Sequence, residues 1–141
     1  MNILIASDHA GFELKSYLID NFQSKCNFTD LGCFEASNVD YPDIAKSLCN
    51  KFLGSSGEYD FGILICGTGI GVSIVANRFN GIKAALCHDA VTSKLARNHN
   101  DANILCLGAR VIDIDVAKDC FHNFVTSDFS GGRHLSRISK I

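Results

Sequence analysis

The sequence has no large excess of charge of either sign. Thirteen Lys and Arg residues against fifteen Asp and Glu residues leave a formal net charge of −2 over 141 residues. A protein that binds nucleic acid along its surface usually carries a dominant basic field, so this balance argues against that class. Any site for an anion must therefore be local.

Long apolar segments and signs of disorder are also missing. No window approaches the length of a membrane span, and the N-terminus MNILIASDHAG lacks the basic segment and long apolar core of a signal peptide. One proline and 20% charged residues, with 47% hydrophobic residues, are ordinary for a folded globular chain. We expect a cytoplasmic protein whose residues 1–141 form one domain.

Closely spaced cysteines are absent, although cysteines are many. The seven cysteines lie at positions 26, 33, 49, 66, 87, 106 and 120, and no two are closer than seven residues. This spacing excludes CxxC redox pairs and the usual zinc motifs. We expect reduced thiols, most of them inert.

What the sequence does contain is short apolar runs that alternate with segments of helical period. The expected strands are NILIAS (2–7), the weaker FTDLG (28–32), DFGILIC (60–66), KAALC (83–87) and NILCLG (103–108). Apolar strands separated by helices are typical of a parallel sheet covered on both faces. We therefore predict an α/β fold: a doubly wound, Rossmann-like domain with a five-stranded parallel sheet. The segment SGGRHLSRISKI follows as a basic helical tail.

Three helices have clear signatures. Leu14, Leu18 and Phe22 recur at fourfold spacing, and Asp40-Tyr41-Pro42 places a proline in the first turn of a second helix. The last helix stacks apolar residues on one side: Ala117, Cys120, Phe121, Phe124 and Val125. In such folds, ligands bind outside the carboxyl ends of the strands. The residues that follow those ends are polar: Ser7-Asp8-His9, Cys66-Gly67-Thr68, Cys87-His88-Asp89 and Gly108-Ala109-Arg110.

The run LICGTGIGVSIVANR (64–78) places a cysteine before three alternate glycines. It is a weak match to a dinucleotide fingerprint, because that motif is G-x-G-x-x-G after the first strand, whereas GTGIGV is G-x-G-x-G after the third. It is not a P-loop, because no lysine follows at the required place. A cysteine phosphatase would need an arginine at position 72, which is valine.

Two interpretations of this loop remain open. Gly67, Gly69 and Gly71 let backbone amides converge, and amides near a helix start favour a bound anion, a reaction oxyanion or the thiolate of Cys66. That interpretation predicts a proton-transfer site. The alternative is a buried core thiol beside a tight turn, since cysteine is among the most buried residue types.

Other polar residues allow similar pairs of interpretations. Asp8 and His9 could cap a helix or contact a ligand. His99 follows Leu95 by four residues, on the apolar side of its helix, where lone histidines are more often core residues than catalysts. Arg133 and Arg137 lie one helical turn apart, so they could grip one phosphate or simply form a solvated tail.

Five motifs in order resemble one family. SDHAG, DYPDIA (40–45), ILICGTGIGVSIVANR, RNHNDANILCLGAR (97–110) and GGRHLSRI (131–138) look like ribose-5-phosphate isomerase type B, of the family shared with bacterial galactose-6-phosphate isomerase subunits. The resemblance spans nearly the whole chain. It implies interconversion of ribose 5-phosphate and ribulose 5-phosphate through an enediolate, without a metal or organic cofactor.

The resemblance also implies the role of each site residue. Cys66 matches the catalytic base, Thr68 orients the proton, and the amides of residues 67–71 stabilise the enediolate oxygen. His99 matches the histidine that opens the sugar ring, and Asn100 holds the open sugar. Asp8 and Tyr41 match residues that contact sugar hydroxyls, whereas the phosphate binders match His9, Arg110, Arg133 and Arg137. Several of these belong to the opposite subunit in family dimers, which implies a homodimer or tetramer.

Two rivals stay open at this stage. One is an isomerase of the same family for a six-carbon sugar phosphate, such as galactose 6-phosphate or allose 6-phosphate. The other is a module that binds a sugar phosphate without turning it over. A family branch that replaces the cysteine by a glutamate elsewhere is disfavoured, because Cys66 is present. His88 receives no role.

Overall fold

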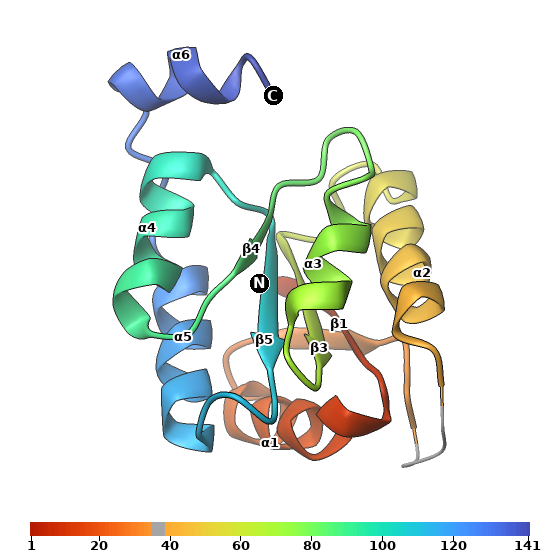
Figure 1. The fold of residues 1–141 in the computed structure, drawn as a ribbon. Coiled ribbons are helices and arrows are strands. Elements are labelled where there is room, and N and C mark those ends of the chain that lie inside the picture. The colour runs from red at the N-terminus through yellow and green to blue at the C-terminus, as the bar shows by residue number, and fades with distance from the viewer. Residues whose placement is uncertain (35–38) are drawn as a thin grey trace.

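The computed structural model describes residues 1–34 and 39–141 as a parallel sheet covered by helices (Figure 1). The strands are β1 (Asn2–Ser7), β2 (Asn27–Asp30), β3 (Phe61–Cys66), β4 (Ala84–Leu86) and β5 (Ile104–Gly108). They pair in the order β2-β1-β3-β5-β4, and every pair is parallel. The predicted fold class and all five predicted strands are confirmed, with ends that differ by one or two residues.

The helices cover both faces of this sheet (Figure 1). The longer ones are α1 (Phe12–Phe22), α2 (Tyr41–Gly54), α3 (Ile70–Ala76), α4 (Ala90–Asn100) and α5 (Ile114–Thr126). Short turns of helix follow β1, as η1 (His9–Gly11), and close the chain, as η2 (Gly132–His134) and α6 (Leu135–Ile138). Residues of α1, α4 and α5 pack in one core cluster with one face of the sheet, and residues of α2 and α3 pack with the other.

The core has the composition that a doubly covered sheet requires. Almost every residue of β1, β3 and β5 is fully buried, because side chains of both faces are covered by helices. All five residues of the predicted apolar side of α5 are buried as well. Phe121 of this helix packs against Phe22 and Phe28, with ring centroids 4.5 and 5.9 Å apart, respectively. The apolar side of α5 therefore faces the core, as the spacing of its apolar residues predicted.

The strand order reverses between β1 and β3. From β1 the chain moves to one edge of the sheet as β2, then returns to place β3 on the other side of β1. Ser7 lies beside Ile65, and Cys66 lies beside Gly108 of β5. A crevice at the carboxyl ends of such neighbouring strands is where ligands of doubly wound sheets bind. Asp8, Cys66 and Arg110 lie at or just beyond these ends.

A buried lysine, Lys15, links the elements near the carboxyl end of β1. Lys15 of α1 is 1% exposed, and its Nζ donates to both carboxylate oxygens of Asp30 at 2.7 and 2.6 Å and to the carbonyl of Cys33 at 2.6 Å. Cys33 in turn donates its backbone N–H to the carbonyl of Ser7 at 2.8 Å. The ion pair therefore connects α1 and β2 to the end of β1.

Replacing Lys15 by methionine should lower the free energy of unfolding by about 3 kcal/mol, because Asp30 would keep a largely desolvated charge without its cation. Urea denaturation measures this change. The double variant Lys15→Met with Asp30→Asn should recover part of the loss, since no unpaired charge remains. Lys46→Met, which removes an exposed pair with Asp43, is the control and should have almost no effect. Equal stability of the Lys15 variant and the wild type would contradict this interpretation.

Within the part of the chain that the structure describes, every helix is too short or too polar to cross a membrane.

Candidate functional site

Cys66 ends β3 and borders a cleft at the carboxyl edge of the sheet. The cleft has a volume of about 420 Å³ and is lined by Asp8, Tyr41, Cys66, Gly67, Thr68, Ile70, Gly71 and Ile74. The thiol is 4% exposed, and its Sγ accepts the backbone N–H of Gly69 at 3.1 Å. The sulfur thus reaches a cavity and faces a main-chain nitrogen, the arrangement that the proton-transfer interpretation requires.

The loop after Cys66 needs its glycines. Gly69 has a φ of +75°, and a Cβ there would lie 2.5 Å from Leu86 Cδ1 and 2.9 Å from the carbonyl carbon of Leu107. A side chain at Gly108 would lie 2.5 Å from the carbonyl oxygen of Thr68. The loop therefore packs directly on β5, where no side chain intervenes. This close packing fixes the Gly69 amide beside the sulfur.

Hydrogen bonds tie the same loop to the next strand end. Ala109 donates its backbone N–H to the carbonyl of Cys66 at 2.9 Å, and Arg110 donates its N–H to the carbonyl of Gly67 at 2.9 Å. A Cβ built on Gly67 would lie 3.5 Å from Arg110 Nη1, so the guanidinium lies over the glycine. Thr68 is exposed, and its Oγ1 accepts the N–H of Ile70 at 3.3 Å. Arg110 thereby places a cation at the start of the glycine loop.

Asp8 fits both of its predicted interpretations. Its Oδ1 caps η1 by accepting the N–H groups of Ala10 at 2.9 Å and Gly11 at 3.1 Å. The same residue, 7% exposed, lines the cleft. His9 follows it, half-buried, and its Nδ1 is buried without a hydrogen-bond partner among the described residues. An unpartnered imidazole nitrogen can accept or donate one further hydrogen bond.

Tyr41 closes the opposite side of the cleft from the first turn of α2. Its ring leaves no room for a side chain on Gly71, where a Cβ would lie 2.6 Å from Tyr41 Cε2. The phenol is 41% exposed, so it can reach a ligand. One region thus holds most of the predicted site residues: Asp8, His9, Tyr41, Cys66, Gly67, Thr68, Gly69, Gly71 and Arg110.

The other four predicted residues lie at the far end of the molecule. Figure 1 shows the C-terminal end of α4 and the helix α6 at the end opposite the carboxyl ends of β3 and β5. His99 and Asn100 are the last residues of α4, Arg133 lies in η2 and Arg137 in α6. The His99 ring stacks on His134, with centroids 4.2 Å apart and an interplanar angle of 8°. Within one chain these four residues do not join the cleft.

His99 lies on an apolar side of α4, but that side faces outward. Val91 and Leu95 are 66% and 38% exposed, whereas Ser93 and Ala96 are buried against the rest of the chain. Small residues allow α4 to approach α5, and the Ser93 hydroxyl donates to the carbonyl of Cys120 at 2.6 Å. His99 is partly buried and is not a core residue, so the structure does not favour the core alternative.

His134 belongs to the motif GGRHLSRI, but the motif alone does not indicate that its ring stacks on His99. Loss of solvation lowers the pKa of His134 below its usual value, and the nearby charges of His99, Arg133 and Arg137 act in the same direction. The imidazole is therefore more readily neutral than a free histidine.

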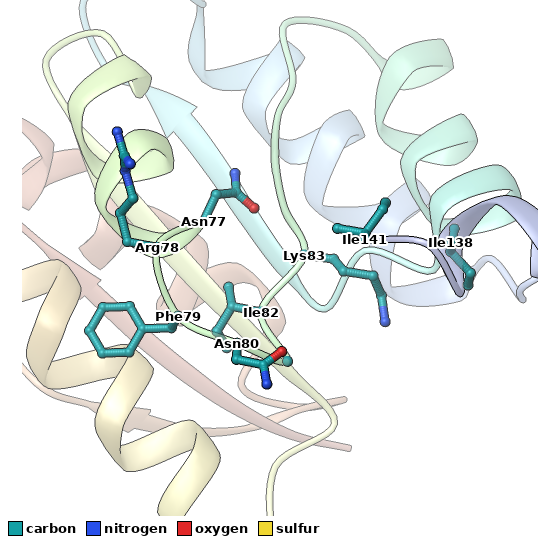
Figure 2. Close-up of a pocket in the computed structure, with 9 residues that line it drawn as sticks. Asn77, Arg78, Phe79, Asn80, Ile82, Lys83, Ile138 and Ile141 are labelled. Atoms are coloured by element: carbon teal, nitrogen blue, oxygen red, sulfur yellow. The ribbon is translucent and has the colours of Figure 1, made fainter.

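A second cavity, of about 360 Å³, lies at this far end. Figure 2 shows its walls, formed by residues 77–83 and by Ile138 and Ile141 of the tail. Arg78 and Lys83 are its cationic residues, and its lining includes no thiol, imidazole or carboxylate side chain. Among the described residues, no group of three or more His, Cys, Asp or Glu side chains is placed to hold a metal ion. The cleft at Cys66 is therefore the better candidate for acid–base chemistry.

Four other cysteines are buried in the core: Cys49, Cys87, Cys106 and Cys120. Burial raises the pKa of Cys49 and of Cys87 to about 11 and that of Cys120 to about 12. It also raises the pKa of Cys106 well above its usual value. These thiols stay protonated near neutral pH and cannot serve as bases. Cys87 and Cys106 are core residues, as their strand patterns predicted.

A thiol and a glycine loop at the switch point of a doubly wound sheet define a class of α/β proteins with a small-ligand site at the carboxyl edge. Comparison with known proteins narrows that class. The sequence description of the family Ribose/Galactose Isomerase matches residues 3–141. The chain belongs to this family, and the resemblance seen in its motifs is confirmed.

Individual relatives match over almost their whole length. A ribose-5-P isomerase B of Listeria innocua is 44% identical, over 98% of this chain and 93% of the relative. The crystal structure of a ribose 5-phosphate isomerase from Thermotoga maritima superposes with a TM-score of 0.94 at 48% identity, covering 99% of this chain and 95% of that one. Ribose-5-phosphate isomerase B from Mycoplasma genitalium with bound ribulose-5-phosphate gives a TM-score of 0.92 at 42% identity, covering 99% and 92%.

Proposed function

We propose that this chain interconverts ribose 5-phosphate and ribulose 5-phosphate. The observation that carries the proposal is the Cys66 sulfur, which borders the cleft and accepts the Gly69 N–H at 3.1 Å. The similarity to isomerases of this name, one of them with bound ribulose-5-phosphate, supports the substrate.

The chemistry is a proton transfer between two neighbouring carbons. The Cys66 thiolate takes the proton from C2 of the open aldose, so that the C–H bond breaks and an S–H bond forms. The electron pair moves to the carbonyl oxygen and gives an enediolate. The thiol then returns the proton to C1, while a proton moves from the C2 hydroxyl to O1. Thr68, beside the base, orients the proton.

The loop amides stabilise the enediolate. Backbone N–H groups of residues 67–71 are the donors that would stabilise the oxyanion, and a single such donor is typically worth ~3 kcal/mol in the transition state. Asp8 and Tyr41 hold sugar hydroxyls. His9 and Arg110 bind the phosphate, for which a guanidinium supplies paired donors.

The active site is completed by a second copy of the chain. His99 and Asn100 of that copy open and hold the sugar, and its Arg133 and Arg137 bind the phosphate. Exposed apolar residues support this homodimer: Ile70 and Ile74 border the cleft with 52% and 55% exposure, and Val91 and Leu95 lead along α4 to His99. Apolar residues gathered beside a site are typical of a protein interface. The substrate and the reduced thiols fit a cytoplasmic enzyme.

A coupled assay of the purified chain with five- and six-carbon aldose phosphates tests the function. We expect turnover of ribose 5-phosphate and, in D₂O, deuterium at C1 of the ribulose 5-phosphate formed. Faster turnover of allose 6-phosphate or galactose 6-phosphate would assign the enzyme to a six-carbon substrate. Binding of ribose 5-phosphate without turnover or exchange of its C2 proton would contradict catalysis and leave a binding module.

A further inference from the structure

The C-terminal turn of α4 is held by an ion-pair network that the proposed mechanism does not use. Arg97 Nη1 donates to Asp101 Oδ1 at 2.8 Å and to the carbonyl of Ala102 at 2.7 Å. Lys83 Nζ lies 3.3 Å from the other carboxylate oxygen of Asp101. The Asp101 carboxylate therefore receives one cation from its own helix and one from the segment before β4.

The Arg97 side chain is fixed by more than this pair. It is 11% exposed, and its guanidinium carbon lies 4.8 Å from the ring centroid of Phe61 and 5.9 Å from that of Phe124. A planar guanidinium stacks on aromatic faces, whereas an ammonium forms no equivalent flat contact. Phe61 is the first residue of β3, and Phe124 belongs to α5. Arg97 thus connects the end of α4 to two rigid elements of the core.

Asp101 ends the helix in a conformation that side chains rarely adopt. Its φ is +47°, in the left-handed region, and its N–H bonds to the carbonyl of Arg97 at 3.1 Å. The N–H of Ala102 bonds to the carbonyl of Ala96 at 3.1 Å. A non-glycine residue in this region is strained, and the surrounding contacts must offset that strain. Without them the turn would relax.

The two residues before Asp101 are His99 and Asn100. Their side chains project from the last turn of α4, so the direction of each depends on how this turn ends. A pair of charges with a stacked guanidinium is more elaborate than a helix end needs, because a glycine at the position of Asp101 would adopt the same φ without strain. The network fixes the last turn of α4, which carries His99 and Asn100, against Phe61 and Phe124.

We propose that Arg97 and Asp101 are positioning residues for His99 and Asn100, and that their pairing sets the rate of sugar ring opening. This inference rests on the proposed function, in which His99 opens the ring. Neither residue touches the substrate. Their effect is limited to the step that uses α4 and does not extend to the proton transfer at Cys66.

The two directions of the reaction separate these steps. Ribose 5-phosphate enters as a closed ring. Ribulose 5-phosphate is open, because the C5 oxygen that would close a five-membered ring on C2 carries the phosphate. Exchange of a C1 proton of ribulose 5-phosphate with D₂O needs Cys66 and the loop but no ring opening. Turnover of ribose 5-phosphate needs both.

The test compares Asp101→Gly, Asp101→Asn and Arg97→Lys with the wild-type dimer. Asp101→Gly keeps the left-handed turn and removes the carboxylate. We expect each variant to lose about tenfold in kcat for ribose 5-phosphate while C1 exchange of ribulose 5-phosphate stays within twofold. Asp101→Asn should retain more activity than Asp101→Gly, because an amide oxygen still accepts from Arg97. Asp115→Asn, in an exposed pair with Lys118, is the control and should change neither rate.

Two outcomes would overturn the inference. Equal losses in turnover and exchange would indicate a general structural defect, as would a fall in melting temperature large enough to unfold the dimer. Wild-type turnover in all three variants would show that the pair has no influence on the site. His99→Asn is measured beside these variants and should also lose turnover of ribose 5-phosphate but keep C1 exchange. If it loses both equally, His99 does not open the ring. The proposed function of His99 then fails, and this inference loses its basis.

Discussion

Replacing Cys66 with alanine should lower kcat for ribose 5-phosphate by about 10²- to 10⁴-fold, because a positioned general acid–base contributes that range. The substitution removes the only atom in the cleft that is proposed to carry the transferred proton. The Gly69 amide, Arg110 and the rest of the cleft stay in place, so affinity for the sugar phosphate should change little. Coupled kinetics and calorimetric titration measure the two quantities. A loss in kcat with an unchanged dissociation constant is the expected pattern.

The variant Cys49→Ala is a control that separates the loss of a catalytic thiol from the loss of a packed side chain. Cys49 of α2 packs in the same core cluster as Cys66, and it is fully buried with a pKa raised to about 11 by burial. Cys49→Ala should lower stability, since it leaves a small cavity, and should leave kcat near the wild-type value. Near wild-type turnover in Cys66→Ala would remove the proposed base. Exchange of solvent deuterium into the sugar by Cys66→Ala, at the wild-type rate, would contradict it equally.

The sheet could be predicted because its signals are local. A strand buried on both faces reads as a continuous apolar run, which identified β1, β3 and β5; the edge strands β2 and β4 are partly exposed and have weaker patterns. The glycine loop was likewise visible, because a positive φ at Gly69 and the close approach of Tyr41 to Gly71 each require glycine. The sequence therefore indicated the cleft and the amides around Cys66.

Features that depend on distant partners could not be predicted. The orientation of α4 is one such feature, because apolar residues need not face the core of their own chain: Ser93 and Ala96 pack inward, while Val91 and Leu95 face solvent. The network at Asp101 depends on Lys83, Arg97 and two aromatic rings brought together only by the fold. Period and composition carry no information about such pairings.

The separation of Cys66 from His99 gives a second large expected effect. One chain carries Cys66, the proposed base, at the carboxyl edge of the sheet and His99, the proposed ring-opening residue, at the end of α4 on the opposite side (Figure 1). If the site is shared, Cys66→Ala and His99→Asn damage different halves of it. Each variant alone should lose about 10²-fold or more in turnover of ribose 5-phosphate. When equal amounts are refolded together, half of the dimers contain one of each chain.

In such a mixed dimer one site combines both substitutions and the other combines neither. Activity should therefore rise to about a quarter of the wild-type value, as the two-fold symmetry of the dimer requires. Affinity tags of two kinds on the chains verify that mixed dimers form. The control pair is Cys66→Ala with Asp8→Asn, both in the same cleft, and it should give no more activity than the Asp8→Asn dimer itself. If the first pair also fails to recover while mixed dimers are present, Cys66 and His99 do not meet across a subunit boundary. The exposed residues Val91 and Leu95 of α4 would then need a different explanation, because they would not lie in an interface that completes the active site of a second copy.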